Sequence, residues 1–359
     1  MSRILLVRND RIGDLVLTLP AIEAVRRAWP QAHIALLASR YAAPLVAGSA
    51  YLDEVLIDDA GQDSTALGHA LATKQFDVAI VFNTNRRNCL APWRAGIPRR
   101  VYWAYKPLAF LLGNRRVAIH RNHPPIHEAA FALAFVRRLG VDFTLADLAP
   151  RLEVDPAVRH QVAHRIHAEL GTTGPLFGIH PGNGDSAFNW PASHYGRLAC
   201  RLARHGRVMV TGRAAERPLI EAVRGELDRS ALARVKFFTD FDLLQLAAAL
   251  SLQTVLTASS TGPMHMAGIL GTPVVALFSP HPAHLAQKWA PLGRGHTLLV
   301  APLEPNEHPR IPRSQGTTVM ARISVEQALV ANLSYLRNPL PVGAEGGHPF
   351  FHRAASRVA

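Results

Sequence analysis

The chain has 359 residues, of which 48% are hydrophobic, and its formal net charge is +13. This length exceeds one ordinary domain and predicts two, each with its own core. No run of about 18 uncharged apolar residues occurs, which excludes a membrane-spanning helix, and the short apolar run after Met1 is not typical of a signal peptide. Cys89 and Cys200 lack metal-ligand spacing and are expected to be free thiols in a reducing cytosol.

Much of the positive charge comes in adjacent arginine pairs, most of which fall between Arg86 and Arg138. Such an excess is expected to draw the protein to an anionic surface, although arginines on solvated faces are an alternative. The chain has no recognisable nucleic-acid-binding module, so nucleic acid is not a predicted partner. The expected partners are the inner-membrane surface and an anionic, lipid-linked or phosphorylated glycan.

Apolar runs alternate with helical patterns along the whole chain. In the first half, strands are predicted at residues 3–7, 33–38, 54–57, 77–82 and 100–102. The helices between them carry apolar residues at helical spacing, as Leu15, Leu19 and Ile22 do. In the second half, strands are predicted at residues 176–179, 207–211, 235–238, 254–257 and 273–278. Continuous Val, Ile and Leu runs are typical of parallel strands that are buried on both faces.

The two βα-repeated halves predict an α/β fold of two Rossmann-like, doubly wound domains that face each other across a cleft. Pro150 and Pro156 flank a short segment at the expected boundary, which gives an N-terminal domain at residues 1–153 and a C-terminal domain at residues 154–337. Residues 338–359 are rich in Gly, Pro and Arg and are expected to form a flexible tail.

Three polar or glycine-bearing loops follow predicted strands, at residues 9–14, 181–185 and 260–263. Open α/β sheets bind their ligands at the carboxyl ends of strands. In the third loop, Thr261, Gly262 and Pro263 precede a helix whose first backbone N–H groups are left without partners. The third loop therefore predicts an anion site suited to a diphosphate. His265 shares a face of the same first turn and could donate to a phosphate oxygen.

Asp14 lies in the first turn of the first helix. An aspartate is favoured there by the helix dipole alone, so capping is one interpretation. Arg8, Asn9, Asp10 and Arg11 surround it, however, and capping needs only one polar side chain. A carboxylate that faces the cleft could act as a general base toward a sugar hydroxyl.

Other chemistries find less support in the sequence. Asp240 and Asp242 resemble a metal-binding pair, but they precede an amphipathic helix, and Asp242 or Asp240 is interpreted as its N-cap. No metal site is predicted, because the histidines have no ligand spacing with carboxylates. The glycine fingerprint of dinucleotide-binding dehydrogenases and the nucleophile elbow of hydrolases do not occur.

Three motifs together resemble glycosyltransferase family 9, the ADP-heptose:lipopolysaccharide heptosyltransferases. They are residues 8–20 (RNDRIGDLVLTLP), residues 180–191 with His-Pro-Gly-Asn-Gly and Asn-Trp-Pro, and residues 260–265 (STGPMH). The resemblance runs from about residue 3 to residue 293. It implies a GT-B fold, with the acceptor on the N-terminal domain and the nucleotide-sugar on the C-terminal domain.

The resemblance also implies inverting, metal-independent transfer of a heptose from ADP-L-glycero-D-manno-heptose to the lipopolysaccharide inner core. The ADP-sugar is a substrate, and no cofactor is expected. The expected location is cytoplasmic, peripheral at the inner face of the inner membrane. A related GT-B enzyme that uses another nucleotide-sugar, such as a transferase or a 2-epimerase, is an alternative. A non-catalytic glycan- or lipid-binding relative is another.

The family's catalytic aspartate falls on Asp14, its diphosphate motif on Thr261, Gly262 and His265, and its ribose-associated glutamate on Glu216. The full set of candidate donor-binding residues is Asn183, Gly184, Arg213, Glu216, Ser260, Thr261, Gly262, Pro263, Met264, His265 and Lys288. The candidate acceptor-binding residues are Arg8, Asn9, Arg11 and His127.

The chain departs from the family pattern at two positions. Ser260 stands where several members have Asp, and Phe188 stands where members often have Lys or Arg. Because phenylalanine cannot neutralise a departing diphosphate, Arg213 or Lys288 is expected to supply the charge.

Overall fold

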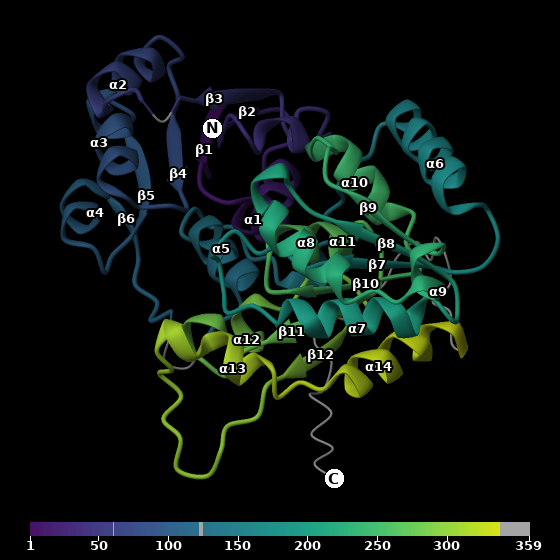
Figure 1. Cartoon of the computed structure of the whole chain (residues 1–359). Helices are drawn as coiled ribbons and strands as arrows, with labels where there is room; N and C mark the ends of the chain where they lie inside the picture. The colour runs from purple at the N-terminus through teal and green to yellow at the C-terminus, as the bar shows by residue number, and fades with distance from the viewer. Residues whose placement is uncertain (60, 122–124, 338–359) are drawn as a thin grey trace.

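The computed structural model describes residues 1–59, 61–121 and 125–337, and the predicted tail at residues 338–359 lies outside them. The described residues form two parallel sheets of six strands each, with helices around them (Figure 1). The α/β fold with two doubly wound domains is therefore confirmed. None of the described helices is long and apolar enough to cross a membrane.

The first sheet has the strand order β3-β2-β1-β4-β5-β6. Its strands are β1 (Arg3–Val7), β2 (His33–Ser39), β3 (Glu54–Asp58), β4 (Val78–Val81), β5 (Arg99–Trp103) and β6 (Arg115–Val117). The helices of this half are α1 (Ile12–Ala28), α2 (Ser64–Ala72), α3 (Arg86–Arg94), α4 (Pro107–Leu112) and α5 (Glu128–Arg137), with short 3-10 helices η1 (Ala43–Val46) and η2 (Leu145–Asp147).

The second sheet has the order β12-β11-β10-β7-β8-β9. Its strands are β7 (Leu176–His180), β8 (Arg207–Thr211), β9 (Val235–Phe238), β10 (Val255–Ser259), β11 (Val274–Phe278) and β12 (Thr297–Val300). The helices are α6 (Pro156–Leu170), α7 (Ala192–Leu202), α8 (Arg217–Gly225), α9 (Arg229–Leu232), α10 (Leu243–Ser251), α11 (Gly262–Ile269), α12 (Ala286–Trp289), α13 (Gly316–Met320) and α14 (Val325–Arg337), and the 3-10 helices are η3 (Ala214–Glu216), η4 (Pro282–His284) and η5 (Arg313–Gln315).

Both sheets have the same topology when their strands are counted in chain order. In each sheet, the first strand lies at the centre beside the fourth strand. Between these two strands the order of strands along the sheet reverses its direction. In the first sheet this switch point lies between β1 and β4, and in the second between β7 and β10. Loops that leave neighbouring strands at a switch point diverge to opposite faces and open a crevice. The three polar loops of the sequence all follow strands at these two points.

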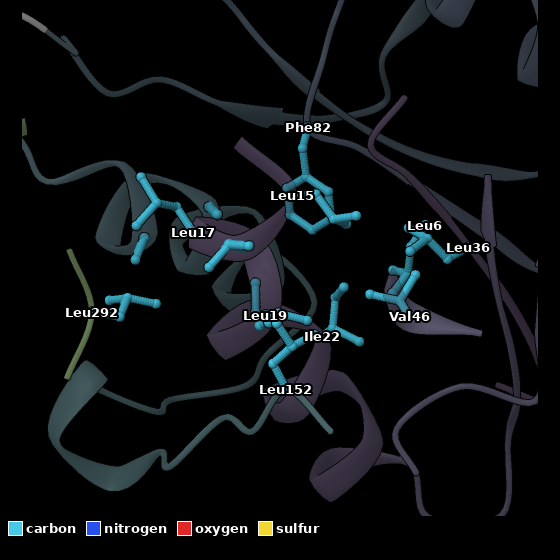
Figure 2. Packing of buried hydrophobic residues seen from close by; sticks show 14 of the residues in the cluster. Leu6, Leu15, Leu17, Leu19, Ile22, Leu36, Val46, Phe82, Leu152 and Leu292 are labelled. Atoms are coloured by element: carbon cyan, nitrogen blue, oxygen red, sulfur yellow. The ribbon is translucent and has the colours of Figure 1, made fainter. Parts of the chain in front are cut away.

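The two halves are packed together through α1 and α11. Residues of α1 such as Leu15 and Leu17 belong to the same apolar cluster as Met264, Met266 and Leu292 of the second half. Figure 2 shows Leu17 and Leu19 of α1 near Leu292 and Leu152. A Cβ added to Gly262 would lie 3.3 Å from Cβ of Ile12, so the first turns of the two helices nearly touch. The buried apolar contact holds the ends of β1 and β10 opposite each other.

The division of the chain at residue 153 stays a prediction. Asp155 caps α6, and α6 packs against α10 of the second half.

Candidate active site

Asp14 lies in a buried network of charged side chains at the carboxyl end of β1. Nη2 of Arg8 donates to Oδ1 of Asp14 over 2.8 Å and to Oε1 of Glu128 over 3.4 Å. Nε of Arg8 lies 3.3 Å from Oδ1 of Asp10. Arg8 is only 4% exposed, whereas Asp14 is 18% exposed. The buried guanidinium therefore orients the Asp14 carboxylate, which keeps one edge accessible.

Glu128 and Arg121 belong to this network but were not among the predicted site residues. Glu128 is the first residue of α5 and is buried. Its Oε2 accepts two bonds from Arg121, from Nε over 3.0 Å and from Nη2 over 2.5 Å. Two guanidinium groups therefore hold one buried carboxylate. Glu128 is the first acidic residue after Asp77, but no local pattern in the sequence assigns it or Arg121 to the site.

The surroundings of Asp14 make it a stronger base than an ordinary aspartate. Burial raises its pKa, the Arg8 guanidinium opposes the shift, and the carboxylates of Asp10 and Glu128 raise the pKa further, to about 6. A carboxylate with a pKa near the operating pH is well suited to accept a proton and release it again.

The structure places the other candidate acceptor residues around the same crevice in different settings. The Asn9 amide donates to Oδ2 of Asp58 over 2.6 Å and to Oδ1 of Asn88 over 2.9 Å, so it is fixed by neighbours of its own sheet. Arg11 is exposed at the N-cap position of α1. Nδ1 of His127 accepts from the Ala129 amide over 3.2 Å at the start of α5.

His127 also connects the two halves of the molecule. Its Nε2 lies 3.0 Å from the carbonyl oxygen of Ala290 and donates to it. Burial lowers its pKa, and the hydrogen bond to Ala290 only partly opposes this. A neutral ring that donates through Nε2 and accepts through Nδ1 satisfies both contacts. The acceptor-binding role assigned to His127 stays a prediction.

The first turn of α11 faces Asp14 from the second half. Thr261 is its N-cap residue and makes no side-chain capping bond, while Pro263 lies in the first turn. This arrangement leaves backbone N–H groups directed at the crevice, where an anion can accept from them. A Cβ added to Gly13 would lie 2.9 Å from Cδ2 of His265. The His265 ring therefore covers the residue next to Asp14.

His265 is buried and neutral. Burial, together with the neighbouring His127 and His296 rings, lowers its pKa to about 3. Its Nδ1 has no hydrogen-bond partner among the described residues. A buried polar atom without a partner is costly unless a ligand supplies one, so His265 is suited to interact with a bound group. The remaining residues of the motif, Ser260 and Met264, are buried beside it.

The loop after β7 packs against Glu216. A Cβ at Gly182 would lie 2.3 Å from Oε2 of Glu216, so only glycine allows this approach. Gly184 has a φ of +51°, in the left-handed region that glycine adopts without strain. The Asn183 amide donates to the carbonyl oxygen of Ala187 over 2.8 Å and holds the loop closed. Asn183 and Gly184 thus shape the loop with their backbone.

Arg213 and Glu216 form a local ion pair at the end of β8. Nη2 of Arg213 lies 2.9 Å from Oε1 of Glu216, and the Arg213 amide donates to Oε2 over 3.0 Å. Burial raises the pKa of Glu216, but the bonds from Arg213 outweigh it and the net shift is downward. The positive charge of Arg213 is therefore largely matched by its own neighbour.

Lys288 lies on the opposite wall, in α12, and is only 6% exposed. Burial lowers its pKa, Arg121 lowers it further, and Glu128 opposes both. These influences place the ammonium group close to the network that surrounds Asp14. Phe188, in contrast, is buried against the His281 and His284 rings, with centroid separations of 5.4 and 4.9 Å. Of the two cations predicted to replace a charge at position 188, Lys288 is the one whose pKa responds to Arg121 and Glu128 of the Asp14 network.

The capping interpretation is confirmed for Asp242 of the Asp-X-Asp pair. Oδ1 of Asp242 accepts from the Gln245 amide over 2.8 Å at the start of α10. Asp240 pairs with Nη2 of Arg165 over 2.9 Å.

The two facing doubly wound domains, with the start of α11 opposite the half-buried carboxylate of Asp14, have the GT-B architecture of glycosyltransferases. Two solved structures agree. Escherichia coli ADP-heptose lipopolysaccharide heptosyltransferase II superposes with a TM-score of 0.77 at 22% identity, covering 94% of this chain and 99% of that one. A family 9 glycosyltransferase from Veillonella parvula superposes with a TM-score of 0.81 at 21% identity, covering 94% and 97%.

The chain belongs to glycosyltransferase family 9 (heptosyltransferase), whose family model matches residues 64–314. It is similar to lipopolysaccharide heptosyltransferase 2 of Escherichia coli (strain K12), with 26% identity over 290 residues that cover 77% of this chain and 83% of that protein. It is also similar to lipooligosaccharide heptosyltransferase 2 of Haemophilus influenzae, with 25% identity over 291 residues and the same coverage. The chain is therefore a glycosyltransferase.

Proposed function

We propose that this glycosyltransferase transfers a heptose from ADP-L-glycero-D-manno-heptose to the inner core of lipopolysaccharide, with inversion at the anomeric carbon. The observation that carries the proposal is the position of Asp14, a carboxylate with a raised pKa that lies beside the first turn of α11. The names of the similar heptosyltransferases support the sugar and the acceptor.

In the proposed reaction, Asp14 takes the proton of an acceptor hydroxyl as the oxygen attacks the anomeric carbon of the heptose. The bond between that carbon and the β-phosphate oxygen breaks, and ADP leaves with the electron pair. Attack from the face opposite ADP inverts the configuration. Arg8 holds Asp14 in place and does not itself give up a proton, because a guanidinium stays charged. Asp14 then releases its proton to solvent.

Charge on the departing ADP is stabilised from the second half of the molecule. The free N–H groups at the start of α11 donate hydrogen bonds to the diphosphate oxygens, and the neutral His265 donates a further hydrogen bond. Lys288 supplies the positive charge that Phe188 cannot. No step requires a metal, and the proposal therefore predicts that EDTA leaves the turnover unchanged. Loss on chelation that Mg²⁺ or Mn²⁺ restores would contradict this part.

The proposed location is the cytoplasmic side of the inner membrane, where a lipid-anchored acceptor is accessible to a protein without a spanning helix among its described residues. The excess of basic residues supports an anionic acceptor or surface.

Acceptor-dependent release of ADP tests the donor and the acceptor together. Purified protein is mixed with ADP-heptose and a lipopolysaccharide core that lacks heptose, and then with ADP-glucose or UDP-N-acetylglucosamine in place of the donor. The proposal predicts release only with ADP-heptose and only when the core is present. Faster release from another nucleotide-sugar would favour the alternative that Phe188 motivates, a related enzyme with a different donor. No release from any donor would favour a relative that only binds glycans.

A further inference from the structure

One outer edge of the first half carries only positive charge. Between Asp77 and Glu128 the chain has no acidic residue, while nine residues are Arg or Lys. The stretch forms β4, β5 and the edge strand β6 together with α3 and α4. Figure 1 shows this group at the left side of the molecule, away from the second half. Basic residues on an edge strand also prevent pairing with another sheet, so charge alone does not identify a partner.

The same edge exposes large apolar side chains. Phe110 and Leu111 are neighbours on α4 and are 52% and 74% exposed, and Tyr105 just before the helix is 45% exposed. The Arg116 guanidinium lies 4.1 Å from the centre of the Phe110 ring. Single exposed apolar residues are common, but adjacent ones with a basic residue beside them are typical of helices that lie in a membrane interface.

A pocket lies between α3 and α4, next to these exposed side chains. It has a volume of about 660 Å³. Its lining residues are Thr84, Asn85, Arg86, Cys89, Lys106, Pro107, Leu108 and Ala109. Lys106 and Arg86 are exposed, whereas Cys89 and Ala109 are buried. The pocket therefore offers an apolar floor with cations near it, which matches the chemistry of a lipid whose headgroup carries a phosphate.

A chain of contacts connects the edge with the candidate active site. The Tyr105 and His120 rings lie 4.4 Å apart between centroids. Arg121 follows His120 directly and binds Glu128, which shares Arg8 with Asp14. A lipid that rests on α4 would thus hold its attached sugar on the side of the first half from which Asp14 is reached.

We propose that this face docks the protein onto an anionic lipid bilayer. The face, called the α4 surface below, consists of Tyr105, Lys106, Phe110, Leu111, Arg115 and Arg116. Phe110 and Leu111 enter the headgroup layer, while Lys106 and the two arginines contact lipid phosphates. The lipid-anchored acceptor comes from the proposed function, but the docking itself depends only on the α4 surface.

Vesicle co-sedimentation tests the docking with the full chain. Vesicles of phosphatidylcholine alone are compared with vesicles that also contain phosphatidylglycerol. The wild type is expected to bind the anionic vesicles, with affinity that falls as salt rises. The double variant Phe110→Ser/Leu111→Ser is expected to lose about tenfold or more in partition coefficient, since each side chain loses the burial of its apolar surface. Lys106→Glu/Arg115→Glu is expected to lose at least as much, because each basic residue contributes about fivefold.

Matched controls come from exposed residues far from α4 in the chain. Val330 and Leu336 on α14 are 60% and 38% exposed, and Val330→Ser/Leu336→Ser is expected to bind vesicles as the wild type does. Arg159→Glu on the exposed face of α6 is the control for charge. Circular dichroism and melting temperature establish that each variant is folded. Arg116 is not substituted, because its Nε donates to the carbonyl oxygen of Phe110 over 2.9 Å and holds α4 in place.

The outcomes separate docking from catalysis. With a water-soluble core oligosaccharide, the α4 variants are expected to release ADP within about twofold of the wild-type rate, whereas with acceptor in vesicles they lose activity in step with binding. The proposal is wrong if folded α4 variants sediment with the vesicles as the wild type does, or if the control variants lose binding equally. It is also wrong if the wild type binds vesicles equally well with and without phosphatidylglycerol. If the vesicle binding is as expected but no nucleotide-sugar is turned over, the docking proposal is supported and the proposed function is wrong.

Discussion

The carboxylate of Asp14 carries the proposed chemistry, and its pKa of about 6 has a consequence for the pH dependence of turnover. A general base must be ionised, so activity requires pH above this pKa. We expect kcat/KM to be level above pH 7 and to fall about tenfold per unit below pH 6. A rate profile with saturating and limiting acceptor measures this. An acid limb near pH 4, the range of an ordinary aspartate, would contradict the raised pKa.

Glu128 is expected to cause part of the upward shift in the pKa of Asp14. Its buried negative charge raises the pKa of Asp14, and it also shares the Arg8 guanidinium. Glu128→Gln removes the charge and leaves Arg8 to Asp14, so the pKa of Asp14 falls and the acid limb of kcat/KM moves to lower pH. A purely structural role would lower the rate at every pH without moving the limb. Glu226→Gln, at a partly exposed glutamate in the second half, is the control.

Lys288 and Arg213 are expected to differ in their effect on the donor. Lys288 is buried beside the crevice, while the charge of Arg213 is matched by Glu216. Lys288→Ala should weaken ADP binding by about 1.5–3 kcal/mol, the worth of a charge-assisted hydrogen bond, and lower kcat as well. Arg213→Ala should change ADP affinity by less than half of this. Calorimetric titration with ADP measures both, and equal losses would contradict the assignment of the cation to Lys288.

The sequence could indicate Asp14 and His265 because each lies in a local pattern, a polar loop between a strand and a helix. Arg121 and Glu128 could not be found in this way. The contact between Glu128 and Arg8 joins segments more than a hundred residues apart, and no spacing along the chain records such a pairing. Arg121 belongs to the network only through its bonds to Glu128. The choice between Arg213 and Lys288 was open for the same reason, since only the fold shows that Arg213 pairs with Glu216 and that Lys288 is buried.

At the scale of elements, the contact between α1 and α11 is expected to be sensitive to a single methyl group. A Cβ at Gly13 would lie 2.9 Å from the His265 ring, so Gly13→Ala should displace that ring and lower kcat/KM by tenfold or more, about the effect of a mispositioned group. Alanine is otherwise favoured over glycine inside a helix by about 1 kcal/mol. A loss of activity without a loss of melting temperature would therefore identify the contact.

Gly48→Ala is the matched control for this substitution, because nothing lies within 4 Å of its added Cβ. Wild-type activity of Gly13→Ala would show that the two helices separate more in solution than the contact allows.

Most strands could be predicted from their apolar runs, and those at residues 3–7, 207–211 and 235–238 have the expected bounds. The edge strands β6 and β12 were missed. β6 is three residues long and carries Arg115 and Arg116, and β12 alternates half-buried with exposed positions. Edge strands are covered on fewer sides, so their sequences need no continuous apolar run and resemble loops.

At the scale of the whole molecule, the raised pKa of Asp14 predicts a link between stability and pH. The folded state holds the Asp14 proton up to about pH 6, whereas the unfolded chain releases it near pH 4, so this residue lowers stability as the pH rises through that interval. Asp14→Asn does not ionise. We expect its melting temperature at pH 8 to equal or exceed that of the wild type, and the difference to shrink at pH 4. A lower melting temperature at pH 8 would show that the charge stabilises the fold.

The central claim is that Asp14 is the base of an inverting heptosyl transfer, and Asp14→Asn tests it most directly. ADP release from ADP-heptose with heptose-deficient core is measured for the variant and the wild type, beside their affinities for ADP. The proposal predicts a loss of kcat of about 10²–10⁴-fold with ADP affinity unchanged, because the substitution removes a base and not a donor contact. Retention of more than about a tenth of the wild-type kcat would contradict it and leave Asp14 as a structural partner of Arg8.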